Sequence, residues 1–400
     1  MRFRRHPWKL PRFSNGWESM DTADSIFGGL VFVSATLWSI VLALPWFPWL
    51  NREVLRSSPG GHFYDLGDVT VVIPARDEAE VIGQTLAALK EQGGGLRVVL
   101  VDDGSTDGTG EAAGRVEGLD LTLLRNESLP PGWSGKLWAL EQGVARVGTE
   151  YTVLLDADIL LQPGVLGVLR EKMRSEGIQF ASLMASLRME NFWERLLMPA
   201  FVYFFKMLYP FALSNSPDRR FAAAAGGCIM LETRLLERIG GFAAIHGALI
   251  DDCTLAKKVK ATGARTWIGL SRAVVSLRRY DTLADVWDMI ARTAFTQLRY
   301  SAWLLALCTL LMLILFWLPA AGLFASDEGV TLAAAWAVLL MAGTYMPTLR
   351  FYGRSAAWGL LMPVIAGAYL AMTWSSALRY WRGERSRWKG RVYSSEDDTG

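Results

Sequence analysis

The sequence predicts an α/β domain with a mostly parallel sheet flanked by helices, joined to α-helical membrane segments. Between residues 68 and 300, short apolar runs typical of strands alternate with stretches of helical spacing. Long stretches without Asp, Glu, Lys or Arg lie on both sides of that block. The whole chain, with 52% hydrophobic residues and a mean hydropathy of +0.22, is too apolar for an ordinary soluble enzyme.

The charge-free stretches each reach the length of roughly 20 residues that crosses a bilayer core. They are residues 26–51, 301–324, 330–349 and 355–378. The first is too long for a signal peptide and no small-residue cleavage site follows it. A fifth apolar segment, 196–213, is interrupted by Pro199, Lys206 and Pro210. We therefore expect it to lie in the membrane interface, with the Lys206 ammonium reaching toward water.

The remaining segments are a basic N-terminal segment at 1–25, a linker at 52–67 and a basic, then acidic, tail at 379–400. The net charge of only +2 gives no global basic field, so a nucleic-acid partner is not expected. The three cysteines form no CxxC pair and no metal-ligand spacing with the three histidines. This pattern favours a reduced protein without a zinc site.

The central block contains four runs that read as buried strands, at residues 69–74, 97–102, 121–125 and 151–156. Residues 78–92 and 163–174 have helical spacing. Polar signatures follow the first, second and fourth strands: "PARDE", "DDGSTDGT" and "DAD". Ligands bind at the carboxyl ends of the strands in such sheets, so we expect these signatures to meet in one site.

The fourth strand ends in two carboxylates, Asp156 and Asp158. Two close carboxylates repel each other and disfavour full ionisation, so a cation is expected between them. A divalent metal is the simplest candidate. The alternative is an Asp-rich turn that caps a helix starting near Pro163.

The motifs "VVIPARDEAEVIGQTLAAL", "VVLVDDGSTDGT", "LLDADI", "GGCIMLETRLLERIGGF" and "LIDDCTLAKKVKATG" together resemble the ordered series of family 2 glycosyltransferases, which have a GT-A fold. The resemblance covers residues 69–269. It implies inverting sugar transfer from a nucleotide-sugar donor, a UDP-sugar, with Mg²⁺ or Mn²⁺ as cofactor. The metal would be held by Asp158, with Asp156 near the metal and the ribose. Oxygen-bound Mg²⁺ or Mn²⁺ stabilises the charge on a departing diphosphate.

The same resemblance assigns further donor-binding residues. Asp77 stands where the family commonly has Asn. Lys136, in "PPGWSGK", is expected to clamp the diphosphate, with a solvated lysine as the alternative. The second acidic signature would bind uracil and ribose, or form only a tight turn in which Asp107 caps a helix. The residues implied for the donor walls are Asp102, Asp103, Ala75, Arg76 and Glu78.

The third acidic pair, Asp251 and Asp252, falls where the family has Glu-Asp before a helix. One carboxylate must take the proton of the acceptor hydroxyl, and the resemblance gives that role to Asp252. Asp251 would orient the site, and helix capping is the alternative for either residue. Arg299 matches the arginine of the QxxRW-type motif of processive synthases and is expected to meet the diphosphate. Thr296 and Tyr300 depart from that motif, which favours transfer of single sugars.

Four further motifs, "GWSGKLWAL", "DDCTLAKKVK", "RTAFTQLRYS" and "WKGRVY", resemble the hopene-associated glycosyltransferases of bacterial hopanoid pathways. This resemblance implies a lipid hydroxyl as acceptor. Another lipid acceptor (a carotenoid, a ceramide-like lipid or polyprenyl phosphate) and a processive polysaccharide synthase are the alternatives. The spans contain no ionisable residue, which argues against a transporter or extruding synthase.

These features place the chain in the bacterial inner membrane as a multi-pass protein. Basic residues at both ends favour the cytoplasm, yet four full spans would then put the central block outside. Because nucleotide sugars are cytosolic, we expect the catalytic block to face the cytoplasm and one segment at each end not to cross. Pro45 and Pro48 make the first stretch a candidate for such a re-entrant or interfacial element.

Overall fold

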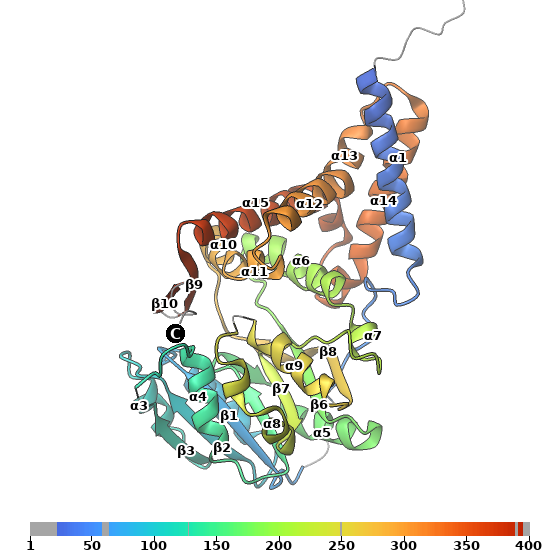
Figure 1. Cartoon of the computed structure of the whole chain (residues 1–400). Coiled ribbons are helices and arrows are strands. Elements are labelled where there is room, and N and C mark those ends of the chain that lie inside the picture. Colours follow the sequence, from blue (N-terminus) through green and yellow to red (C-terminus); the bar gives the residue numbers. More distant parts are fainter. Residues whose placement is uncertain (1–21, 58–63, 127, 249, 389–390, 395–400) are drawn as a thin grey trace, which may run out of the picture.

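The computed structural model describes residues 22–57, 64–126, 128–248, 250–388 and 391–394. A sheet domain lies at one end, a layer of helices covers it, and a pair of long helices extends away from that layer (Figure 1). Most of the expected basic N-terminal segment, part of the linker and the end of the tail lie outside the described residues.

One half of the eight-stranded sheet is parallel, in the order β3-β2-β1-β4. This half confirms the strands expected from the four apolar runs. Its strands are β1 (Val69–Ala75), β2 (Arg97–Asp102), β3 (Asp120–Arg125) and β4 (Tyr151–Leu155).

Helices cover both faces of β1, which explains why its residues form an apolar run without alternation. Val71 and Ile73 share a core cluster with α2 (Ile82–Lys90). Val72, which points to the other face, shares a cluster with α4 (Gly135–Val144). The short helix α3 (Thr109–Gly114) follows the turn after β2.

The other half of the sheet is mixed and was not predicted. The order continues β4-β7-β6-β8-β5, in which only β6 and β8 pair in parallel. The strands are β5 (Ile159–Leu161), β6 (Phe180–Ser186), β7 (Cys228–Glu232) and β8 (Thr266–Ser276), and the helices of this half are α5 (Val165–Glu176), α8 (Arg234–Ile239), η1 (Phe242–Ile245) and α9 (Asp251–Ala261).

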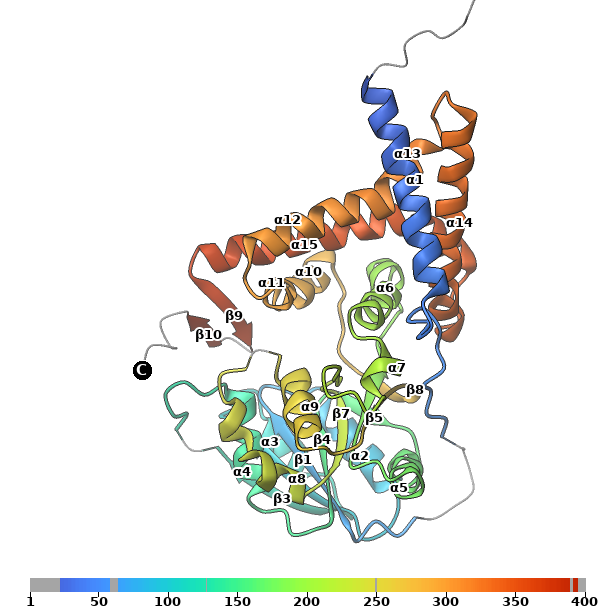
Figure 2. The same ribbon diagram turned by 45° about the vertical axis from the view of Figure 1, so that its right-hand side comes forward.

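In the part of the chain that the structure describes, four helices are long and apolar enough to cross a membrane, as the composition predicts. The helices α1 and α14 lie side by side and extend away from the sheet, whereas α12 and α15 run crosswise to them (Figures 1 and 2). The bounds are α1 (Thr22–Ala43), α12 (Ala302–Met312) continued by the π-helical η2 (Leu313–Trp317) and α13 (Leu318–Gly322), α14 (Glu328–Phe351), and α15 (Met362–Trp381) preceded by η3 (Ala356–Leu361).

The first helix ends eight residues before the predicted boundary at Asn51. It stops at Ala43 because Pro45 has no backbone N–H and disfavours helical geometry at the residue before it. Residues 44–50 form turns instead. At the other end, β9 (Glu384–Trp388) pairs antiparallel with β10 (Arg391–Ser394) within the expected tail.

A layer of shorter helices lies between the sheet and the crosswise pair (Figure 2). It contains α6 (Phe192–Leu208), α7 (Phe211–Ser214), α10 (Leu283–Ala291) and α11 (Ala294–Gln297). The helix α6 continues through Pro199 and packs against α14 and α15. Its Tyr203 hydroxyl lies 3.0 Å from the Thr344 hydroxyl, and the Tyr369 hydroxyl donates to the Leu197 carbonyl at 2.9 Å.

The expectation that the Lys206 ammonium reaches water is wrong. Lys206 is only 1% exposed, and its ammonium donates to the side-chain oxygen of Asn51. The Asn51 amide in turn donates to the carbonyl of Pro347 in α14 at 2.9 Å. The turns after α1 supply this partner, so sequence spacing within α6 alone gave no sign of it.

Candidate active site

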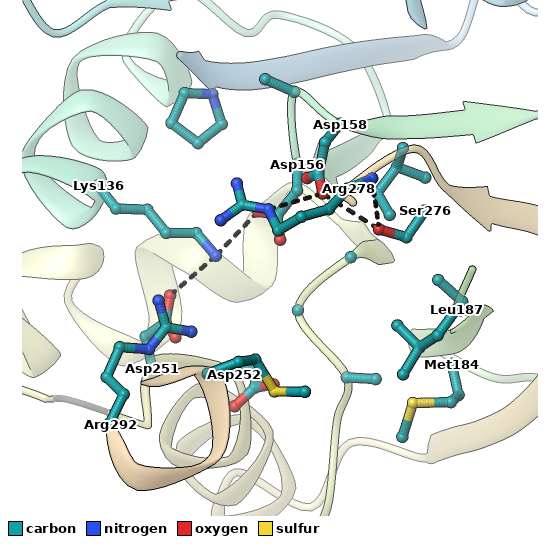
Figure 3. Close-up of a pocket in the computed structure, with 18 of the residues that line it drawn as sticks. Lys136, Asp156, Asp158, Met184, Leu187, Asp251, Asp252, Ser276, Arg278 and Arg292 are labelled. Carbon is teal, nitrogen blue, oxygen red and sulfur yellow. Dashed lines mark hydrogen bonds and ion pairs between the residues drawn. The ribbon is translucent and has the colours of Figure 1, made fainter. Parts of the chain in front are cut away.

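A cavity of about 320 Å³ opens where the carboxyl ends of β1 and β4 meet the amino ends of α4 and α9. Figure 3 shows that side chains from these separate elements point into it. Six of the predicted site residues line the cavity together, and three of them follow strand ends as expected. They are Glu78, Asp156 and Asp158 after strands, and Lys136, Asp251 and Asp252 at the starts of helices.

The carboxylate of Asp158 is bound by a guanidinium group and a hydroxyl group from the end of β8. The Arg278 Nε donates to the Asp158 carboxylate at 3.2 Å, and the Ser276 hydroxyl donates to the same oxygen at 3.1 Å. Arg278 also reaches the Glu78 carboxylate at 3.1 Å. A single guanidinium thus bridges the signatures that follow β1 and β4.

Lys136 forms ion pairs with one carboxylate of the signature after β4 and one carboxylate of α9. Its ammonium lies 2.9 Å from Asp156 and 3.4 Å from Asp251. The lysine is positioned by the first turn of α4, where the Ser134 hydroxyl caps the helix by accepting from Leu137 N at 3.3 Å. The side chain is only 23% exposed, so the alternative of a solvated lysine is wrong.

Helix capping does not account for the acidic residues. The N-cap of α5 is Gly164 and that of α9 is Ile250, and neither cap has a side-chain hydrogen bond. Asp251 and Asp252 instead occupy the first turn of α9, where carboxylates interact favourably with the helix dipole. The expected turn after β2 is present, with Asp107 accepting from Thr109 N at 3.0 Å.

The two carboxylates of α9 have different surroundings. Asp251 contacts Lys136, whereas Asp252 lies apart from that ion pair (Figure 3). The Asp252 carboxylate accepts a hydrogen bond from Cys253 N at 2.7 Å. Burial, together with the charge of Asp251, raises the pKa of Asp252 to about 7.

The charges of the cavity are strongly coupled. Burial favours the neutral forms of Lys136 and Asp156. For Lys136, burial alone would lower the pKa, but the charges of Asp156 and Asp251 raise it above its ordinary value. For Asp156, burial raises the pKa, and Lys136 opposes that shift. For Arg278, burial alone would lower the pKa, but the combined negative groups around it, Asp158 foremost, raise the pKa above its ordinary value.

The residues assigned to the nucleoside form an adjoining group. Arg76 lies 3.6 Å from the Asp103 carboxylate, and Asp103 N donates to the Ala75 carbonyl at 2.8 Å. The Asp102 carboxylate accepts from Ser105 N at 2.9 Å. Asp77 adopts a left-handed conformation with φ of 50°, which Asp tolerates better than most residues. Nucleoside binding here stays a prediction.

Asp77 also has a structural contact that explains its position. Its carboxylate accepts from Thr106 N at 2.9 Å, and its own N–H donates to the Ser105 hydroxyl at 3.0 Å. These bonds fasten the turn after β2 to the turn after β1.

Arg299 is not brought into the cavity. It is exposed, with φ of 51°, and is absent from the lining. Arg292, at the C-cap of α10, lines the cavity instead (Figure 3). Sequence reasoning missed Arg292, Arg278 and Ser276. The string "VVSLRRY" could have indicated Ser276 and Arg278 as site residues, because the other signatures also consist of polar residues at the end of an apolar strand.

The two carboxylates supply only part of the ligand set that a divalent cation needs. Asp156 and Asp158 offer oxygen ligands, which Mg²⁺ and Mn²⁺ prefer. No group of three or more His, Cys, Asp and Glu side chains suited to a metal occurs among the described residues. A cation held here therefore needs further oxygen ligands, which a diphosphate and water supply.

The far end of the cavity is apolar and faces the membrane helices. Phe201 and Phe205 come from α6, Met289 from α10, and Met184 and Leu187 from β6 and the residue after it. The same α6 packs on α14 and α15. The cavity thus joins a charged end to an apolar end beneath the membrane helices.

Residues 70–240 match the family described as Glycosyl transferase family 2. These residues form a family 2 glycosyltransferase domain. The chain is also 34% identical over 91 residues to the 4,4'-diaponeurosporenoate glycosyltransferase of Staphylococcus aureus. That match covers 23% of this chain and 24% of the relative, so the chain spans about a quarter of the length of the curated relatives it matches.

The chain is similar in fold to a solved structure, the mannosyltransferase PcManGT from Pyrobaculum calidifontis in complex with GDP-Man and Mn²⁺. The TM-score is 0.53 at 20% sequence identity, and the match covers 90% of this chain and 100% of that one. The GT-A fold expected from the sequence is thereby confirmed.

Proposed function

We propose that the chain is a membrane-bound, inverting glycosyltransferase that moves a sugar from a nucleotide-sugar donor to the hydroxyl of a lipid. The observation that carries the proposal is the single cavity with a charged end and an apolar end. The charged end suits a sugar diphosphate, and the apolar end lies where a lipid arrives from the membrane helices. The family 2 domain supports the reaction class.

Six charged residues of the cavity then have a role in the reaction. Asp156 and Asp158 would hold Mg²⁺ or Mn²⁺ with the diphosphate, and the Mn²⁺ complex of PcManGT supports this role. The bound cation supplies Lewis-acid stabilisation of the departing diphosphate. Lys136 and Arg292 add positive charge beside the leaving group. Asp252 accepts the proton of the acceptor hydroxyl, and Asp251 holds Lys136 in place.

The finer assignments rest on resemblance. A UDP-sugar as donor and a hopanoid as acceptor follow from the sequence motifs, whereas the Staphylococcus aureus relative favours a carotenoid-type acceptor. The absence of Arg299 from the cavity supports transfer of single sugars over processive synthesis. We place the protein in the bacterial inner membrane, with the sheet domain facing the cytoplasm, where nucleotide sugars are available.

The test uses the purified full chain in detergent with Mn²⁺, a panel of nucleotide sugars, and hopanoid, carotenoid and polyprenyl-phosphate lipids. Mass spectrometry should find one lipid that gains a single sugar. A sugar polymer would favour the processive alternative instead. Donor hydrolysis without any glycosylated lipid, across the panel and a total lipid extract, would contradict the proposal.

The apolar end of the cavity gives a prediction about the acceptor. Replacing Met289 by Trp adds volume beside Phe201 and Phe205, so the lipid should fit poorly. We expect kcat/KM for the lipid to fall roughly tenfold or more, while the affinity for the donor stays unchanged. Met289→Leu, which conserves volume, is the matched control and should behave like the wild type. Equal kcat/KM values for Met289→Trp and Met289→Leu would place the lipid elsewhere.

A further inference from the structure

A second pocket, of about 760 Å³, lies at the end of α14 that faces the sheet domain. Residues Phe351–Arg354 form one side of it, immediately where the candidate membrane span Glu328–Phe351 ends. Its other sides come from the residues after β6, from β8 and from the start of α2. The pocket adjoins the active-site cavity at Leu187 and Ser276 but contains none of its carboxylates.

The lining is rich in arginine. Arg188, Arg272, Arg279 and Arg354 face two carboxylates, Glu80 and Glu190. These four arginines come from three separate parts of the chain, so they converge through the fold and not through one local basic run.

Two of the four arginines contact only neutral groups among the described residues. The Arg272 guanidinium donates to the Arg350 carbonyl at 3.2 Å and lies 4.9 Å from the centre of the Phe351 ring. Arg354 donates to the Met189 carbonyl at 2.9 Å. By contrast, Arg188 pairs with Glu190, and Arg279 pairs with Asp281 at 3.1 Å. Arg272 and Arg354 therefore form no ion pair with a carboxylate of the described residues.

Some N–H groups of these arginines also lack a hydrogen-bond acceptor. The Nε atoms of Arg188 and Arg354 are buried and donate to no acceptor. A buried N–H without an acceptor is costly, and the planar guanidinium suits the oxygens of a phosphate. An anionic group in the pocket would therefore gain both charge and hydrogen bonds.

We propose that this pocket binds the phosphate headgroup of an anionic membrane phospholipid. Its place at the end of a membrane span brings it to headgroup level, and the aromatic side chains of Phe351 and Tyr352 in its lining suit the boundary between headgroups and acyl chains. Basic pockets at that level attract anionic lipids. A phospholipid bound there fixes the sheet domain against the bilayer beside the active site.

The experiment measures lipid binding to the full chain in neutral detergent by native mass spectrometry, with phosphatidylglycerol and phosphatidylcholine as probes. The wild type should retain one phosphatidylglycerol in preference to phosphatidylcholine. Arg272→Gln/Arg354→Gln should weaken phosphatidylglycerol binding on the order of 10- to 30-fold and leave phosphatidylcholine binding unchanged. The control Arg115→Gln/Arg234→Gln removes the same charge from exposed sites on the sheet domain and should resemble the wild type.

Several outcomes would overturn the proposal. They are equal phosphatidylglycerol affinity in the wild type and the double variant, an equal loss in the control, or no preference between the two lipids. A further arm adds inorganic phosphate at millimolar concentration, because a free anion offers the same oxygens. Displacement of the lipid by phosphate would show a site for free phosphate and reject the lipid. If the double variant is unstable, the exposed Arg272→Gln alone must show a loss of roughly fivefold.

Discussion

Asp158→Asn should abolish most of the sugar transfer while leaving the fold intact. The variant removes one negative charge from the carboxylate pair that would hold the divalent cation, so stabilisation of the departing diphosphate is lost. We expect kcat to fall on the order of 10² or more. The measurement is the transfer rate as a function of Mn²⁺ concentration, with Asp120→Asn, at an exposed position on the edge strand, as the control.

The fold should survive because an amide keeps an oxygen that accepts from Arg278 and Ser276. Thermal unfolding of the variant checks this point. Isothermal titration with Mn²⁺ and the nucleotide diphosphate should show that the loss lies in cation binding. Transfer by the wild type that continues undiminished in excess chelator would reject the metal assignment, and so would an Asp158→Asn variant that matches the control.

The parallel half of the sheet and its acidic signatures were predictable because they depend on local patterns. A strand buried on both faces is a continuous apolar run, and the residues that follow such strands share one edge of the sheet. From these two rules alone, without the tertiary contacts, one can predict that Glu78, Asp156 and Asp158 lie in one cavity.

The mixed half of the sheet could not be predicted in the same way. The strand β8 extends to Ser276, and its end delivers Arg278 to Asp158, more than a hundred residues away in the sequence. Arg292 enters from a helix of the layer beneath the membrane segments. The string after β8 indicates polar residues at a strand end, but the pairing of Arg278 with Asp158 and the entry of Arg292 depend on how separate elements pack.

The same reason explains the error at Lys206. A lysine near the end of an apolar segment usually reaches water, but the turns that follow α1 place Asn51 against it. The sequence also did not show which of the membrane helices extend away from the sheet. Length and apolar content are alike for α14 and α15, yet only α14 lies beside α1 and extends away from the sheet (Figure 2).

The two acids of α9 should respond differently to substitution. Asp252→Asn preserves size and removes the proton acceptor, so donor affinity should survive while transfer to the lipid falls on the order of 10² or more. Asp251→Asn loses a partner of Lys136 but leaves the contact between Lys136 and Asp156, so its effect should be milder. The decisive comparison is the transfer rate of the two variants at saturating donor and acceptor.

The pH dependence separates proton transfer from a structural role of Asp252. Burial raises the pKa of Asp252 to about 7, so below that pH the carboxyl group is protonated and accepts no proton from the acceptor hydroxyl. The wild-type rate should therefore rise with pH up to about 7 and then level off, with a fall of about tenfold per unit on the acid side. The residual rate of Asp252→Asn should lack that rise, because the group that titrates is gone.

An Asp252→Asn enzyme as fast as the wild type, beside an inactive Asp251→Asn enzyme, would assign the role of general base to Asp251. A pH rise that persists in Asp252→Asn would assign the titration to another group.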